Sequence, residues 1–176
     1  MMTSYEKETI RDLIDGRLPW QSTKSIMSQY KDDDRFFKYI DILQERVKFN
    51  DPILLPIGEH LYIVARQDEP QDERVVKCGC GHEFGHYTRN WKLGAVINVR
   101  DDEASIAEIY PGRHSYDPDW MEIREFFCPS CATLLEVEAA APGYPIVFDF
   151  LPYLETFYRD WLGRELPPEP SRARNS

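Results

Sequence analysis

The sequence predicts an α+β protein in which a mainly antiparallel β region is flanked by helices at both ends. Three observations predict this fold class. Apolar residues recur every three or four positions within residues 1–50 and again after residue 150, as in amphipathic helices. Between them, short runs of β-branched and aromatic residues alternate with Gly, Pro and Asp, as in strands joined by turns. Four cysteines, in two pairs that follow predicted strands, add a zinc-ribbon-like site.

Residues 1–50 are expected to form a helical N-terminal segment. A first helix over residues 4–15 ends at Gly16, and a second covers residues 23–30. A third begins at the run Asp32–Asp34, and its apolar positions are Phe36, Phe37, Ile40, Leu43 and Val47. Because acidic residues stabilise the positive end of a helix, the Asp run is interpreted as a solvated helix start rather than a cation site.

Residues 51–150 are expected to form a β-rich, zinc-ribbon-like domain. The segment ILLPIGEHLYIVARQ predicts two short strands around Gly58 and Glu59. Further strands are predicted in RVVK, KLGAVINVR, MEIREFFC and TLLEVEA, with a short helix in DEASIAEIY.

Residues 151–164 are expected to form a C-terminal helix, with Pro152 in its first turn and Gly163 as its stop. The apolar positions of this helix are Leu154, Phe157, Tyr158, Trp161 and Leu162. The Pro-rich tail, residues 165–176, is expected to be disordered or bound along a partner.

The formal charge of −10 and the isoelectric point near 4.9 make nucleic acid and anionic membrane surfaces unfavourable partners. The start MMTSYEKETIRDLIDG has charges where a signal peptide has its apolar core, and no apolar run is long enough to span a membrane. We therefore expect a cytoplasmic protein. In a reducing compartment, four cysteines are expected to bind metal or to do redox chemistry rather than to form structural disulfides.

Both cysteine pairs lie where a predicted strand enters a turn. Cys128 and Cys131 have the Cys-x-x-Cys spacing of a zinc knuckle, in which two thiolates chelate one tetrahedral ion. Cys78 and Cys80 are closer together, and we expect positive φ angles at Gly79 and Gly81 to let their sulfurs converge. Together the four thiolates predict a closed structural Zn²⁺ site, although iron fits the same tetrahedron.

Two alternatives use the same segment for catalysis. In one, His82 or His86 replaces a cysteine ligand, or Glu83 acts as a general base beside an open zinc ion. Zinc deaminases have His-x-Glu and a Pro before the second Cys pair, whereas here Glu83 directly follows His82 and Phe127 precedes Cys128. In the other, the second pair is a thioredoxin-type redox motif, but the following ATLLEVE favours a strand over the required helix.

No phosphate-binding loop, nucleophile elbow or dinucleotide fingerprint is present in the sequence, so no catalytic site is predicted. Aromatic residues make up 13% of the chain, which indicates a large core or a surface covered by a partner. Among them, Trp20, Trp91 and Trp120 are each expected in the core rather than at an interface.

An ordered series of short motifs from about Ile10 to Gly163 resembles the small zinc-containing subunit of the ATP-dependent acetone and acetophenone carboxylases. These motifs are DILQERV, ILLPIGEHLYIV, CGCGH, NWKLGA, VRD, EIYP, IREFFCPSCATLLEVEA, PGYP and FYRDWLG. The resemblance assigns the zinc ligands to Cys78, Cys80, Cys128 and Cys131. One departure is Ala132, at a position where Gly commonly follows the second Cys of a knuckle.

The resemblance implies an accessory subunit of a cytoplasmic hetero-oligomer that joins a ketone and bicarbonate into a β-keto acid. It places ATP and a catalytic divalent metal on larger, hydantoinase-like subunits, so no catalysis is expected from this chain alone. The alternatives are a stand-alone zinc-ribbon interaction module and a small metalloenzyme that uses His82 or Glu83 at an open zinc ion.

Overall fold

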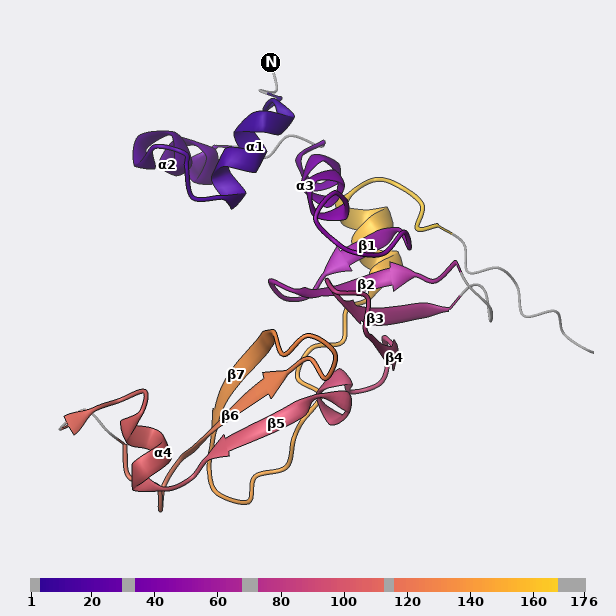
Figure 1. Cartoon of the computed structure of the whole chain (residues 1–176). Coiled ribbons are helices and arrows are strands. Elements are labelled where there is room, and N and C mark those ends of the chain that lie inside the picture. The colour runs from indigo at the N-terminus through magenta and orange to yellow at the C-terminus, as the bar shows by residue number, and fades with distance from the viewer. Residues whose placement is uncertain (1–3, 30–33, 68–72, 113–115, 168–176) are drawn as a thin grey trace, which may run out of the picture.

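The computed structural model describes residues 4–29, 34–67, 73–112 and 116–167 of the chain. Two antiparallel sheets form the middle of the protein, with helices at the N-terminal and C-terminal sides of the sequence (Figure 1). This arrangement confirms the predicted α+β fold class. The division of the chain into segments at residues 50, 150 and 164 stays a prediction.

The N-terminal helices are α1 (Lys7–Ile14), α2 (Trp20–Ser28) and α3 (Arg35–Gln44). All three are predicted by the sequence, although α2 begins at Trp20 rather than Thr23. Asp34 precedes α3 but makes no side-chain capping hydrogen bond, and Asp32 and Asp33 lie outside the described residues. Helix α1 packs against α3, and Arg11 of α1 donates a hydrogen bond of 2.7 Å to Glu45 just after α3.

The first sheet contains β1 (Ile53–Pro56), β2 (Leu61–Ala65), β3 (Arg74–Cys78) and β4 (Glu83–His86), in that order. The sequence predicts the first three strands but not β4. Its four residues lack an alternating apolar pattern, and Gly85 has a φ of +94°, which accompanies a shift in the pairing of β4 with β3.

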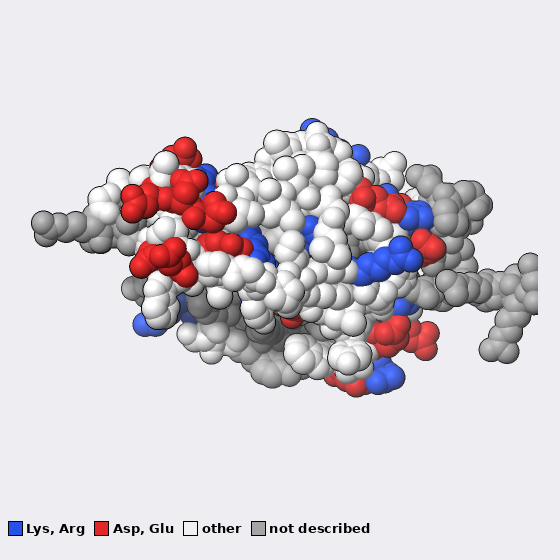
Figure 2. Space-filling model, turned by 90° about the horizontal axis from the view of Figure 1, so that it is seen from below, with Lys and Arg blue, Asp and Glu red and all other residues white. Residues whose placement is uncertain are grey.

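The second sheet has the order β5–β6–β7, with β5 (Val96–Arg100), β6 (Glu122–Phe127) and β7 (Leu134–Ala140). A short 3₁₀ turn, η1 (Trp91–Gly94), leads from β4 into β5. The helix predicted between β5 and β6 is α4 (Glu103–Ala107), which projects from the end of the sheet (Figure 1). Acidic side chains gather at this end of the molecule (Figure 2), among them Asp101, Asp102, Glu103 and Glu108.

The C-terminal helix begins at Leu154, so the prediction that Pro152 lies in its first turn is wrong. It consists of α5 (Leu154–Thr156) followed by a π-helical turn, η3 (Phe157–Trp161). Gly163 has a φ of +62° and ends it, as predicted. The Tyr158 hydroxyl donates a buried hydrogen bond of 2.8 Å to the Leu54 carbonyl, which attaches this helix to β1. Residues 168–176 of the tail lie outside the described residues.

The first sheet is covered on both faces. One face packs against α3 through a cluster formed by Leu43, Ile53, Tyr62, Val64 and Val75. The other face packs against β6 and the C-terminal helix through a cluster formed by Leu54, Leu61, Ile63, Val76, Trp91, Phe126 and Leu154. Trp91 is therefore in the core, as predicted, whereas Trp20 and Trp120 are exposed and that prediction is wrong for them. The second of these two apolar clusters contains Val76 of β3 and Phe126 of β6, so it holds these two strands together.

Candidate metal centre

The two cysteine pairs lie at the tips of two β-hairpins, one from each sheet. Cys78 is the last residue of β3, and Cys80 lies in the turn to β4. Cys128 follows β6, and Cys131 lies in the turn to β7. Backbone N–H groups close both turns, since Gly81 donates to the Cys78 carbonyl at 2.8 Å and Ala132 to the Cys128 carbonyl at 2.9 Å.

The four sulfur atoms all lie within 4.8 Å of one another. The Sγ atoms of Cys78 and Cys131 are 3.7 Å apart, as are those of Cys80 and Cys128. A tetrahedral zinc ion with Zn–S bonds of about 2.3 Å separates its sulfurs by roughly 3.8 Å, whereas a disulfide bond is only about 2.05 Å long. The arrangement therefore fits four ligands of one ion, and all four cysteines are free of disulfide bonds.

Backbone N–H groups also point at the sulfurs, as expected for zinc knuckles. The N–H of Cys80 reaches the sulfur of Cys78, and the N–H of His82 reaches the sulfur of Cys80. In the second hairpin, the N–H of Thr133 reaches the sulfur of Cys131. Each of these contacts lowers the pKa of the thiol involved. Burial has the larger effect at the first hairpin and raises the pKa of the Cys78 and Cys80 thiols. At the exposed Cys131, the Thr133 hydroxyl contributes most and lowers the thiol pKa to about 6. A bound divalent cation would deprotonate all four thiols.

The hairpin turns require unusual backbone angles at two positions. Gly81 has a φ of +97°, as predicted, but Gly79 has no positive φ, so the prediction for Gly79 is wrong. Ala132 has a φ of +55°, a left-handed conformation that an alanine side chain disfavours. The knuckle therefore keeps the same left-handed turn that Gly usually makes at this position.

Replacing Ala132 with Gly is expected to raise the free energy of unfolding. Relief of the left-handed strain is worth about 1–2 kcal/mol, and the added flexibility of the unfolded chain offsets roughly 0.5–1 kcal/mol of it. Urea unfolding should therefore show a net gain of up to about 1.5 kcal/mol. As the matched control, Ala107→Gly, at the exposed end of α4, should lower the free energy by about 0.5–1 kcal/mol. Equal losses in both variants would contradict the prediction.

The histidines near the cysteines have other partners. The Nδ1 atom of His82 lies 2.8 Å from the hydroxyl of Ser130, so these side chains join the two hairpins outside the sulfur cluster. The His82 ring also packs edge-on against Phe84 at 4.9 Å. His86 lies at the far end of β4, where its Nδ1 atom is 2.7 Å from the hydroxyl of Thr88. Neither histidine belongs to the group of side chains that could share a metal ion.

Glu83 is held in an ion-pair network on the first sheet. Its carboxylate contacts the guanidinium of Arg66, and the ammonium of Lys77 lies 3.8 Å away. Lys77 in turn makes a buried ion pair of 2.6 Å with Asp51. These ion pairs keep the Glu83 carboxylate in a structural contact on the first sheet, which argues against a proton-transfer role beside a metal ion.

A second buried polar cluster, on the second sheet, was not predicted from the sequence. The ammonium of Lys92 lies 2.6 Å from Glu136, 3.0 Å from Glu138 and 3.2 Å from Asp149, and its side chain is only 1% exposed. Arg124 contacts Glu138 at 3.2 Å from the other side. The sequence signal was the pair of acidic residues two positions apart on β7, which places both carboxylates on one face of the strand.

Burial alone lowers the pKa of Lys92. Hydrogen bonds to Glu136, Glu138 and Asp149 outweigh that effect, and the net pKa is raised above the ordinary lysine value. Lys92 therefore stays protonated inside the protein. It also lies 5.3 Å from the centre of the Phe126 ring, which ties the ionic cluster to the apolar core.

Two β-hairpins that bring four thiols within reach of one ion define a zinc-ribbon-like protein. A sequence model of the family described as acetone carboxylase gamma subunit matches residues 47–162. The chain belongs to this family, which confirms the resemblance found in its sequence motifs. Within the described residues, no helix is long and apolar enough to cross a membrane.

Two relatives support the assignment. The chain is 44% identical over 170 residues to the acetone carboxylase gamma subunit of Xanthobacter autotrophicus, and the match covers 97% of this chain and 98% of the relative. It is 32% identical over 80 residues to the acetophenone carboxylase beta subunit of Aromatoleum aromaticum, which covers 44% of this chain and 62% of that relative.

Proposed function

We propose that this chain is the zinc-binding accessory subunit of an ATP-dependent ketone carboxylase. The observation that carries the proposal is the 44% identity to an acetone carboxylase gamma subunit along nearly the whole of both chains. The reaction joins a ketone and bicarbonate into a β-keto acid. In this proposal ATP and the catalytic divalent metal are bound by larger, hydantoinase-like subunits of a cytoplasmic hetero-oligomer.

This chain has a structural role in the complex. Cys78, Cys80, Cys128 and Cys131 hold one Zn²⁺ ion, and four thiolate ligands leave no open position for a substrate or a water molecule. The ion fastens the first sheet to the second, because each sheet supplies one pair of ligands. A fixed angle between the two hairpins gives the larger subunits a rigid surface to bind.

Co-expression with the larger carboxylase subunits tests the proposal. A tagged copy of this chain should co-purify with them, and the complex should fix labelled bicarbonate into acetone or acetophenone only when ATP is present. Elemental analysis should find one zinc ion, and no iron, per copy of this chain. A chain that remains free, or larger subunits that are stable and fully active without it, would contradict the proposal.

Glu83→Ala is expected to leave the zinc content and the carboxylase activity of the complex unchanged. The carboxylate contacts Arg66 and Lys77 rather than a metal site, so its loss should lower the free energy of unfolding by only about 1 kcal/mol. Glu73→Ala removes another carboxylate partner of Arg66, at 3.3 Å, and is the matched control. Activity lost by Glu83→Ala alone, with zinc retained, would favour the open-zinc metalloenzyme.

A further inference from the structure

Residues 141–153, here called the strap, connect β7 to α5 without forming a helix or a strand. The strap crosses the second sheet and is attached to it at a few points. The Tyr144 carbonyl accepts a hydrogen bond from Arg124, the Ile146 carbonyl accepts one of 3.4 Å from Asn90, and Asp149 pairs with Lys92. Connections of this length without regular structure are uncommon in compact domains and often serve as binding loops.

The strap is rich in exposed apolar side chains. Five large ones are between 38% and 80% exposed, namely Tyr144, Val147, Phe150, Leu151 and Tyr153. A monomeric protein rarely gathers so many in one short segment, and aromatic residues in particular are enriched where protein partners dock. Within the described residues, the strap is therefore an apolar surface that no other segment covers.

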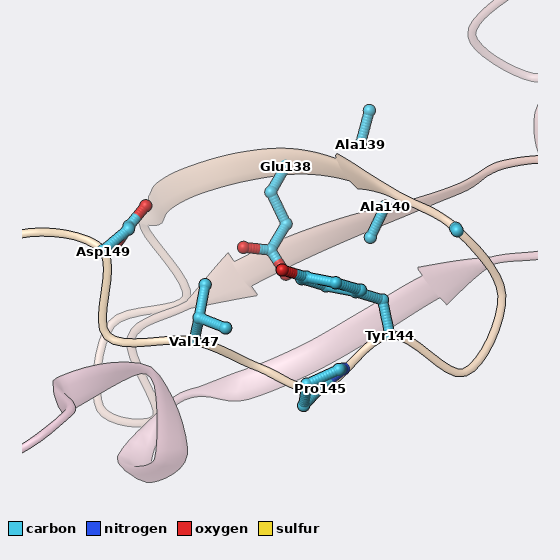
Figure 3. Close-up of a pocket in the computed structure, with 8 residues that line it drawn as sticks. Glu138, Ala139, Ala140, Tyr144, Pro145, Val147 and Asp149 are labelled. Atoms are coloured by element: carbon cyan, nitrogen blue, oxygen red, sulfur yellow. The ribbon is translucent and has the colours of Figure 1, made fainter.

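A groove of about 440 Å³ lies between the strap and β7 (Figure 3). Its walls are mostly apolar and are formed by Ala139, Ala140, Ala141, Pro145 and Val147. Glu138, Tyr144 and Asp149 supply its polar groups (Figure 3).

The groove carries an excess of negative charge. Glu136, Glu138 and Asp149 share the single ammonium of Lys92. Arg124 adds one cation and contacts Glu122 as well as Glu138. These four carboxylates and two cations give the groove and the side chains behind it a net charge of −2. The Asp149 side chain, at the edge of the groove, is 54% exposed.

We propose that the strap and its groove form a docking surface for a partner polypeptide that inserts an arginine or lysine side chain into the groove. The apolar walls suit the alkyl stem of such a side chain, the carboxylates suit its charged head, and the Tyr144 ring offers a cation–π contact. Apolar residues of the partner that flank the inserted side chain cover Phe150 and the other exposed apolar residues of the strap. The inference rests on the proposed function, in which this partner is a larger carboxylase subunit.

Matched pairs of variants test the two parts of the surface in the co-expressed complex. Phe150→Ser should weaken binding to the larger subunits at least about tenfold, because it removes a central apolar contact. Trp120→Ser, on a more exposed aromatic residue at the α4 end, should change binding by less than about twofold. Asp149→Lys should weaken binding at least about tenfold through repulsion of the inserted cation, whereas Asp160→Lys, 48% exposed on the C-terminal helix, should have little effect.

Hydrogen exchange in the unaltered complex gives a readout that needs no variant. Exchange at residues 141–153 should slow at least about tenfold when the larger subunits bind. Unchanged exchange there, or normal binding by either Phe150→Ser or Asp149→Lys, overturns the docking surface while the proposed function stands. Failure of the unaltered chain to bind the larger subunits overturns both.

Discussion

Replacing Cys131 with Ser is expected to abolish stoichiometric metal binding and to lower the free energy of unfolding by more than about 4 kcal/mol. Because the Cys131 side chain is exposed, serine removes a ligand with little loss of buried packing. The effect should therefore report the metal ion, whose binding free energy contributes directly to folding. Elemental analysis and urea unfolding measure the two changes.

Ser130→Ala is the control in the same hairpin. It removes the contact with His82 but keeps all four thiols, so zinc should remain and stability should fall by only about 1 kcal/mol. A strong chelator should destabilise the unaltered protein and the Ser130 variant but have no further effect on Cys131→Ser. Full metal content and an unchanged unfolding midpoint in Cys131→Ser would exclude the four-thiolate site.

Local sequence pattern was sufficient for most of the fold. Strands such as β2 and β6 are dense in β-branched or aromatic residues, and the N-terminal helices have clear apolar periodicity. Strand β4 was missed because its pairing with β3 is set by the turn between Cys78 and Glu83 rather than by its own composition. The π-helical turn at Phe157–Trp161 was missed for a related reason, since it depends on tertiary packing around the buried Tyr158.

In the candidate metal site, too, the features set by local sequence were predictable and those set by tertiary contacts were not. The cysteine pairs could be found because each pair is local in sequence and its spacing has few other uses. The partners of His82 and Glu83 could not be found, because Ser130 and Arg66 approach them only after the sheets have formed. The Lys92 cluster likewise joins residues from η1, β7 and the strap, and the spacing of the acidic pair on β7 does not reveal the partners from the other two segments.

Replacing Lys92 with Met is expected to lower the free energy of unfolding by about 3–5 kcal/mol. Methionine matches the lysine stem and preserves contact with Phe126, but it leaves Glu136, Glu138 and Asp149 without the cation they share. Partly buried carboxylates that have lost their counter-charge account for the loss. Lys48→Met, at an exposed lysine, should change stability by less than about 0.5 kcal/mol.

The pH dependence identifies the cause of the Lys92→Met deficit. In the unaltered protein the pKa of Lys92 is raised on folding. The ion pairs of Lys92 therefore contribute fully to the free energy of unfolding below the unfolded lysine pKa of about 10.4, and this contribution is lost as pH rises through the folded pKa. In the variant Glu136, Glu138 and Asp149 repel one another without the cation they share, and acid relieves this repulsion by neutralising carboxylates. The deficit relative to the unaltered protein should therefore be largest near neutral pH and shrink on acidification.

A second substitution separates charge from packing. Adding Glu136→Gln to Lys92→Met removes a carboxylate whose ion pair was with Lys92, so the double variant should regain roughly 1–2 kcal/mol over Lys92→Met alone. If packing were responsible, the second substitution would add to the damage, and the deficit would not change with pH. The expected recovery would show that Lys92 holds together a surplus of negative charge, which is the same surplus that the groove beneath the strap presents to a partner.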